Sequence, residues 1–137
     1  MTIKTIGRCL GQATDGSIWF FCPGCTGPHS IKVNAPNTLG PNWGYNGNPD
    51  APTFTPSVLA RTTGAPGGRS VMTPEEEAEY DAIYAKGGRE AVYASRFGQV
   101  CHSFVTDGRI QYLDDCTHSL AGSTVELPSW EEAWAHW

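Results

Sequence analysis

The stretch SIWFFCPGCTGPHSIKV, Ser17 to Val33, places two cysteines three residues apart between two short runs of apolar and β-branched residues. Such runs are typical of β-strands, and the Pro-Gly pair between the cysteines is typical of a turn. The sequence therefore predicts two strands joined by a turn that carries Cys22 and Cys25. Two thiols at this spacing can bind a metal ion, form a redox disulfide or remain unpaired.

The surroundings of the two cysteines favour a metal ion. A redox Cys-x-x-Cys motif is expected to open a helix, whose N-terminus lowers the thiol pKa. Here Thr26 and Pro28 lead into a strand pattern instead. The chain holds five cysteines, an odd number, and begins without an apolar signal-peptide pattern, so we expect a cytoplasmic protein in which disulfides are rare. Plain buried thiols remain an alternative, and we expect Cys9 to be one.

The rest of the sequence predicts one α+β domain, residues 1–137, built on a small, mostly antiparallel β core of hairpins clamped by zinc. The clearest hairpin is QVCHSFVTDGRIQYL, residues 99–113, because Asp107-Gly108 is a favoured two-residue turn. Residues 34–56, rich in Asn, Gly and Pro, are expected to form a structured loop. Further strands are expected over residues 2–12, 57–61 and 124–127.

Two helices are predicted by their capping residues. Thr73, Pro74 and Glu76 form a helix start, and Gly87 is the expected end of that helix. A short second helix over residues 89–96 completes a helical insertion, residues 62–98. Ser129 with Glu132 predicts a C-terminal helix.

Charge and hydropathy restrict the partners that we expect. The net charge is −5, with only nine lysines and arginines, which argues against nucleic acid and anionic membranes as partners. The longest uninterrupted apolar run, residues 18–22, is far shorter than the roughly 20 residues of a membrane helix. We therefore expect no nucleic-acid partner and no membrane contact.

A second group of metal-ligating residue types lies in and after the clearest hairpin: Cys101, His102, Cys116 and His118. Zinc takes four such ligands in a tetrahedron, so this group can complete a site begun by the paired cysteines. Neighbours on a regular strand point to opposite faces, so Cys101 and His102 both reach one ion only at a strand end or bulge. The fourth ligand stays open among His102, His118, Cys116 and His29, in that order of preference.

The runs CHSFVTDGRIQYLDDCTHSLAGSTVELP, FCPGC, and W-x-x-NG leading into PTFTPSV resemble a family of small phage and prophage proteins of unassigned function, often mislabelled ammonia monooxygenase. More distant relatives lie beside bacterial ubiquitin-like conjugation genes, where a zinc peptidase role is suspected. The resemblance covers residues 17–61 and 99–128. Ammonia oxidation needs a copper or di-metal site, and no carboxylate and histidine group of that kind stands out here.

The resemblance implies a zinc-containing peptidase or isopeptidase that acts on protein substrates, ubiquitin-like proteins among them, in the host cytoplasm where a phage encodes it. The family cysteines match Cys22 and Cys25, its Pro-Ser step matches Pro56-Ser57, and its histidine matches His102. The family cysteine before that histidine is displaced here to Cys101. The expected Zn²⁺ ligands are therefore Cys22, Cys25, Cys101 and His102.

The catalytic residues depend on whether the zinc keeps an open position. With an open position, zinc-bound water is the nucleophile, and Asp115 and His118 are the expected base and acid. With a closed site, the expected nucleophile is Ser57 or Ser103, activated by His118. The alternative function is a noncatalytic zinc-stabilised module that binds a host protein.

Overall fold

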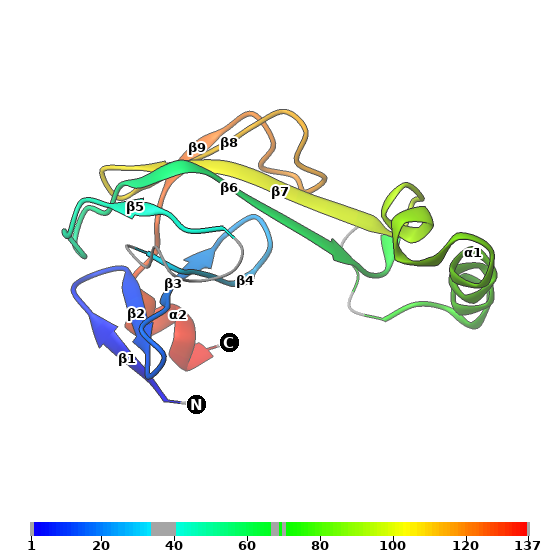
Figure 1. The fold of residues 1–137 in the computed structure, drawn as a ribbon, viewed down its shortest axis with the longest axis horizontal. Coiled ribbons are helices and arrows are strands. Elements are labelled where there is room, and N and C mark those ends of the chain that lie inside the picture. Colours follow the sequence, from blue (N-terminus) through cyan, green and yellow to red (C-terminus); the bar gives the residue numbers. More distant parts are fainter. Residues whose placement is uncertain (1, 34–40, 67–68, 70, 137) are drawn as a thin grey trace.

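A computed structural model describes residues 2–33, 41–66, 69 and 71–136. It has two antiparallel sheets and two helices, one inserted and one C-terminal, which confirms the predicted α+β class (Figure 1). The first sheet has the order β1-β2-β3-β4, with strands β1 (Ile3–Ile6), β2 (Leu10–Ala13), β3 (Ile18–Cys22) and β4 (Gly27–Ile31). The second has the order β5-β6-β7-β8-β9, with strands β5 (Gly44–Tyr45), β6 (Phe54–Thr63), β7 (Gly98–Thr106), β8 (Arg109–Tyr112) and β9 (Thr124–Glu126).

The first sheet differs from the prediction at its start. The single strand expected over residues 2–12 is two strands, β1 and β2, because the chain reverses just after Gly7. Gly7 has φ +56°, and a Cβ there would lie 2.7 Å from Pro49 Cβ, so glycine permits both the turn and the close approach. The next hairpin, β3 and β4, carries Cys22 and Cys25 at its turn, as predicted.

The second sheet is dominated by the antiparallel pair β6 and β7. Figure 1 shows these two long strands running out from the rest of the molecule toward the inserted helix. The predicted hairpin of β7 and β8 is confirmed, with Asp107 (φ 50°) and Gly108 (φ 79°) both in the left-handed conformation of a type I′ turn. In the loop predicted over residues 34–56, residues 34–40 lie outside the described part of the chain, and the remainder holds β5.

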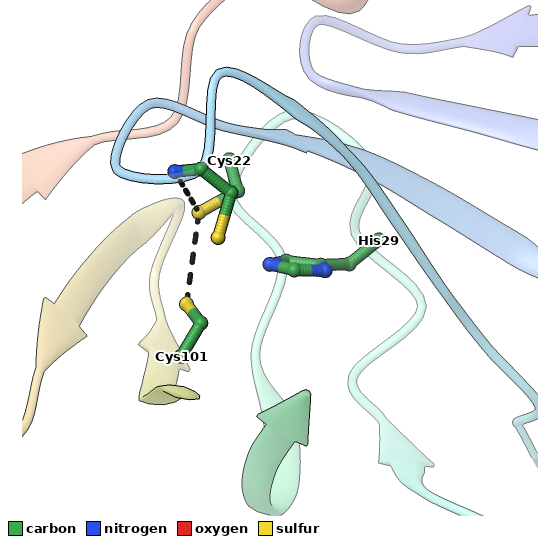
Figure 2. A group of neighbouring side chains, drawn as sticks. Cys22, His29 and Cys101 are labelled. Atoms are coloured by element: carbon green, nitrogen blue, oxygen red, sulfur yellow. Dashed lines mark hydrogen bonds between the residues drawn. The ribbon is translucent and has the colours of Figure 1, made fainter. Parts of the chain in front are cut away.

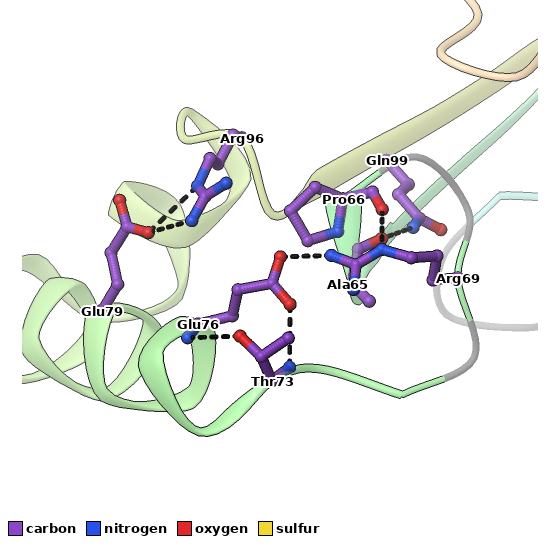
Figure 3. A network of polar contacts seen from close by, with 8 residues as sticks. All are labelled: Ala65, Pro66, Arg69, Thr73, Glu76, Glu79, Arg96 and Gln99. Carbon is purple, nitrogen blue, oxygen red and sulfur yellow. Dashed lines mark hydrogen bonds and ion pairs between the residues drawn. The ribbon is translucent and has the colours of Figure 1, made fainter.

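The insertion is formed by α1 (Pro74–Tyr93), which begins with the predicted capping box between Thr73 and Glu76. The helix breaks at Gly88 (φ 68°) and continues to Tyr93, so both helices predicted here join in one kinked element. Figure 3 shows the hydrogen bonds between Glu76 and Thr73 and the ion pair between Glu76 and Arg69. A second ion pair joins Glu79 and Arg96. These contacts hold α1 at the far ends of β6 and β7.

The core lies between the two sheets and draws buried side chains from both. Its largest members include Phe20 from β3, Phe54 from β6 and Tyr112 from β8. The C-terminal helix α2 (Trp130–His136) begins after Ser129 as predicted, and Ser129 Oγ accepts a hydrogen bond from the Glu132 backbone N–H. Trp130 is fully buried, so α2 is tied to the first sheet.

Candidate active site and metal centre

Strand β7 carries two functional groups on its two faces. Cys101 and His102 are consecutive, and regular pairing with Ala60 and Leu59 of β6 continues through both residues. Their side chains therefore leave the strand in opposite directions. Cys101 is buried in the core, whereas the side chain of His102 is 26% exposed on the outer face. Cys101 and His102 therefore belong to two separate groups of residues, one on each face of β7.

The inner face presents a candidate metal centre. Donor atoms of Cys22, Cys25, His29 and Cys101 all lie within 4.8 Å of one another. Figure 2 shows the Cys101 thiol and the His29 ring directed at Cys22. Zinc–sulfur bonds of about 2.3 Å in a tetrahedron separate two sulfurs by about 3.8 Å. The Sγ atoms of Cys22 and Cys101 are 3.8 Å apart, so the spacing fits such an ion.

The local structure explains how four donors meet. Cys22 ends β3, and Cys25 closes the turn, where its N–H donates to Cys22 Sγ at 3.4 Å. His29 pairs with Phe20 across the hairpin, and Phe20 shares its face of β3 with Cys22. His29 Nε2 is buried with no hydrogen-bond partner among the described residues. A metal ion would satisfy that atom, which is otherwise costly to bury.

The electrostatics of the cysteines agree with this interpretation. The hydrogen bond with the Cys101 thiol lowers the pKa of Cys22, and the same bond raises the pKa of Cys101 above its usual range. Without a cation, the group therefore favours one thiolate beside protonated thiols, because adjacent negative charges repel each other. Tyr112 Oη accepts from the Gly24 N–H at 3.0 Å and lies 3.1 Å from Cys22 Sγ. Burial raises the pKa of Tyr112, so its hydroxyl remains a donor to the sulfur.

A second group shares Cys101 with the first. Donor atoms of Cys101, Cys116 and His118 also lie within 4.8 Å of one another. His118 packs edge-on against Tyr112, with ring centroids 4.5 Å apart, and its Nδ1 accepts from the Leu120 N–H. Its Nε2 is buried and has no hydrogen-bond partner among the described residues. His118 is thus a second imidazole on the metal side of β7.

The outer face holds three residues in the arrangement of a catalytic triad. The Ser57 hydroxyl lies 2.9 Å from His102 Nε2, and His102 Nδ1 lies 3.1 Å from Asp115 Oδ2. One ring nitrogen therefore faces a hydroxyl while the other faces a carboxylate. This is the geometry in which a histidine removes the serine proton and a carboxylate fixes the histidine tautomer.

Backbone irregularities position the serine and the aspartate. The register of β6 against β7 shifts between Phe54 and Val58, so Ser57 lies in a bulge, a feature common beside active sites. Trp43 Nε1 donates to the Ser57 carbonyl at 3.1 Å and fixes the bulge from the other side. The Asp115 side chain is 56% exposed, so the triad is open to solvent.

The loop after β8 is bound to β7 around His102. The Leu113 N–H donates to the His102 carbonyl at 2.9 Å, and the Thr117 N–H donates to the Val100 carbonyl at 2.9 Å. Between them, Cys116 Sγ contacts both the N–H and the carbonyl of His102 at 3.2 Å. These bonds fix the segment that carries Asp115.

The structure distributes the site residues differently from the sequence expectations. It brings Cys22, Cys25 and Cys101 together, with His29 rather than His102 beside them. It brings Ser57 and Asp115 together through His102, while His118 lies with Cys101 and Cys116. His102, expected as a ligand, instead lies between Ser57 and Asp115, because strand alternation turns it away from Cys101. Ser103, the other serine expected as a nucleophile, is fully buried on the inner face of β7.

A family model described as "Bacterial ubiquitination-like system serine protease (BubE)" matches residues 4–113 of the chain. The match spans Ser57 and His102 and ends two residues before Asp115. No curated protein and no solved structure shows significant similarity to the chain. Neither helix in the described ranges has the length and apolar composition needed to cross a bilayer.

Proposed function

We propose a function for this protein from one premise: the chain belongs to the family of bacterial ubiquitination-like system serine proteases. The proposal is that it is a serine peptidase in which Ser57 is the nucleophile, His102 the general base and Asp115 the residue that orients the base. The observation that carries it is the pair of contacts to the two ring nitrogens of His102. The triad residues follow the chain order Ser, His, Asp, and a triad is recognised by geometry rather than by order.

The proposed reaction follows from these contacts. Ser57 Oγ attacks the substrate carbonyl carbon while His102 Nε2 accepts the hydroxyl proton. His102 then donates that proton to the leaving amine, and an acyl ester on Ser57 remains. Water, deprotonated by the same nitrogen, hydrolyses the ester and restores Ser57. Throughout the reaction, the Asp115 carboxylate accepts a hydrogen bond from His102 Nδ1–H and stabilises the charged imidazole.

The metal has a structural role in this proposal, and we assign it as zinc. Three thiols and one imidazole match the donor set of closed structural zinc sites, which leave no position for a reacting water. Cys22, Cys25 and His29 come from the first sheet and its hairpin turn, whereas Cys101 comes from the second. Zinc would therefore join the two sheets directly behind the triad.

The proposed substrate is a protein or an isopeptide-linked conjugate of a ubiquitination-like system. Family membership supports this, as does the position of Ser57 and His102 on an exposed sheet face that a polypeptide can reach. Cytoplasmic location belongs to the same proposal, since thiol ligands are kept reduced there.

A fluorophosphonate probe, which labels activated serines, tests the proposal. We expect stoichiometric labelling of Ser57 in the full-length protein, identified by peptide mass spectrometry. Ser57→Ala and His102→Ala should each abolish the labelling, whereas Ser103→Ala should retain it. Labelling that survives in Ser57→Ala, or a wild-type protein that does not react, would refute the serine mechanism.

The noncatalytic alternative predicts a different result in that experiment. A module that only binds a host protein needs its zinc for folding but has no activated serine. It would bind one zinc per chain, resist the probe, and lose nothing in binding when Ser57 is replaced by alanine. Reaction of Ser57 with the probe distinguishes the two functions.

A further inference from the structure

On the outer face of β6 and β7, four side chains surround one buried pair of residues. Val58 of β6 is paired with Ser103 of β7, and both side chains are buried on the inner face. Strand alternation therefore directs Leu59, His102 and Phe104 outward. Ser57 lies in the bulge, and its hydroxyl contacts His102 on this same face. The four residues are Ser57 and Leu59 on β6, and His102 and Phe104 on β7.

These four side chains form two diagonals. Ser57 and His102 lie on one, joined by the 2.9 Å contact of the proposed triad. The other diagonal joins Leu59 and Phe104. Leu59 is the direct partner of His102, and Phe104 lies two residues beyond His102 on β7. The apolar diagonal therefore crosses the catalytic one.

Leu59 and Phe104 are unusual among the apolar residues of the described chain because water reaches them. Leu59 is 52% exposed and Phe104 is 42% exposed, although both lie within regular strands. Surface apolar residues are common singly, but a pair beside a nucleophile has a use in binding. A peptide whose carbonyl reaches Ser57 can therefore lie over both side chains.

The spacing of the pair fits an extended peptide. Diagonal neighbours in an antiparallel sheet are separated by about 7–8 Å. In an extended chain, every second side chain points to the same side, and such side chains repeat at about 6.6–6.8 Å. A substrate running along this diagonal would place two alternate side chains on Leu59 and Phe104, with the intervening backbone over Ser57.

We infer that Leu59 and Phe104 form the substrate-binding subsite of the peptidase, and that it takes an extended segment with two apolar residues separated by one residue. Cleavage occurs at one of the two peptide bonds that join the intervening residue to those apolar residues. The inference rests on the proposed function, because it assumes that Ser57 is the nucleophile. Leu59 and Phe104 act as specificity residues and contribute no group to the chemistry.

The first experiment profiles cleavage of a proteome-derived peptide library by the full-length protein, with Ser57→Ala as the background control. We expect the cleaved sequences to be enriched in aliphatic or aromatic residues at two positions one residue apart, with the cut between them. No such enrichment among the cleaved peptides would overturn the inference while leaving the triad intact.

The second experiment measures kinetics on a fluorogenic peptide chosen from that library. Burial of a leucine-sized side chain against the substrate contributes to the binding free energy. Leu59→Ala and Phe104→Ala should therefore each raise KM roughly five- to tenfold with little change in kcat. The control is Val71→Ala, which truncates another exposed apolar residue and should leave KM unchanged. Leu59→Lys should shift the preference toward an acidic residue at one of the two positions, a change that a structural defect would not produce.

The outcomes separate the inference from its premise. A wild-type protein that cleaves no peptide and does not react with the fluorophosphonate overturns both. A protein that reacts and cleaves, but whose KM is the same in Leu59→Ala, Phe104→Ala and wild type, overturns the subsite alone.

Discussion

Cys101 and His102 are adjacent in the chain, yet Cys101 faces the candidate metal centre and His102 forms a hydrogen bond with Ser57 on the other side of the sheet. One strand thus supplies both a proposed metal donor and the proposed base. Any change that moves β7 at this point moves both groups, so metal binding and hydrolysis should be linked through the backbone although they use separate side chains.

Removing the metal should destabilise the protein and then abolish hydrolysis. An ion held at a free concentration of about 1,000 times its Kd contributes about 4 kcal/mol to stability, which corresponds to a Tm shift of roughly 10 °C or more in a domain of this size. We expect chelator-treated protein to show that decrease in calorimetry, and zinc to restore both Tm and activity. Retention of full activity in metal-free protein would contradict the linkage.

Replacement of the three histidines on the two faces of β7 should give three different results. His29→Ala should lose zinc by elemental analysis, because His29 is the imidazole beside the three thiols. His102→Ala should keep its zinc and lose at least about 10³-fold in kcat. His118→Ala should keep its zinc and most of its activity. Zinc lost in His118→Ala but kept in His29→Ala would instead make His118 the fourth ligand.

Asp115→Asn should reduce kcat by about 10²- to 10⁴-fold with little effect on KM. An amide in place of the carboxylate favours the wrong imidazole tautomer and does not stabilise the imidazolium. The matched control is Asp114→Asn, since Asp114 is the exposed neighbour in the same loop. Single-turnover measurement of acyl-enzyme formation locates the defect. Equal rates in Asp115→Asn and Asp114→Asn would remove Asp115 from the mechanism.

The start of α1 should lose stability in acid. The backbone N–H of Thr73 and the Arg69 guanidinium lower the pKa of Glu76 from 4.5 to about 2. The pKa of Glu76 is lower in the folded state than in the unfolded state. Its contribution to stability is therefore complete above pH 4.5 and is lost as the pH falls through about 2. Circular dichroism of the helix between pH 6 and pH 2 measures this loss.

The control for that titration is Glu76→Gln, which can still form the capping box but carries no charge. We expect its helix signal to lack the acid transition assigned to Glu76. An unchanged transition in Glu76→Gln would assign it to another carboxylate. Peptidase activity at neutral pH should be the same in both proteins, since α1 lies at the far end of the β6 and β7 pair (Figure 1).

The sequence predicted the β3–β4 and β7–β8 hairpins and the starts of both capped helices, because these features depend on neighbouring residues. It predicted one strand over residues 2–12, where the structure has β1 and β2. It also contained the argument that Cys101 and His102 point to opposite faces of a regular strand. His29 was the last of the four candidates for the fourth ligand. Once the β3 and β4 register is known, His29 lies opposite Phe20 and on the same face as Cys22. The missing information was the length of the turn, which sets that register.

The contact between Ser57 and His102 could not be derived in this way. It depends on the register of β6 against β7. The first of these strands ends at Thr63 and the second begins at Gly98, so 34 residues (64–97) connect them. A bulge beside Ser57 then shifts the pairing again. A connection as long as residues 64–97 does not determine how β6 pairs with β7. The contact between Ser57 and His102 therefore follows only from the three-dimensional structure.

The same connection has a consequence for how this protein can be lengthened or trimmed. Leu59 pairs with His102 and Thr63 with Gly98, so the ladder is complete before the chain enters the inserted helix. Segments of very different size could replace residues 64–97 while the serine and the histidine keep their alignment. The tip of this hairpin is therefore a site where recognition elements can be added without altering the proposed hydrolytic centre.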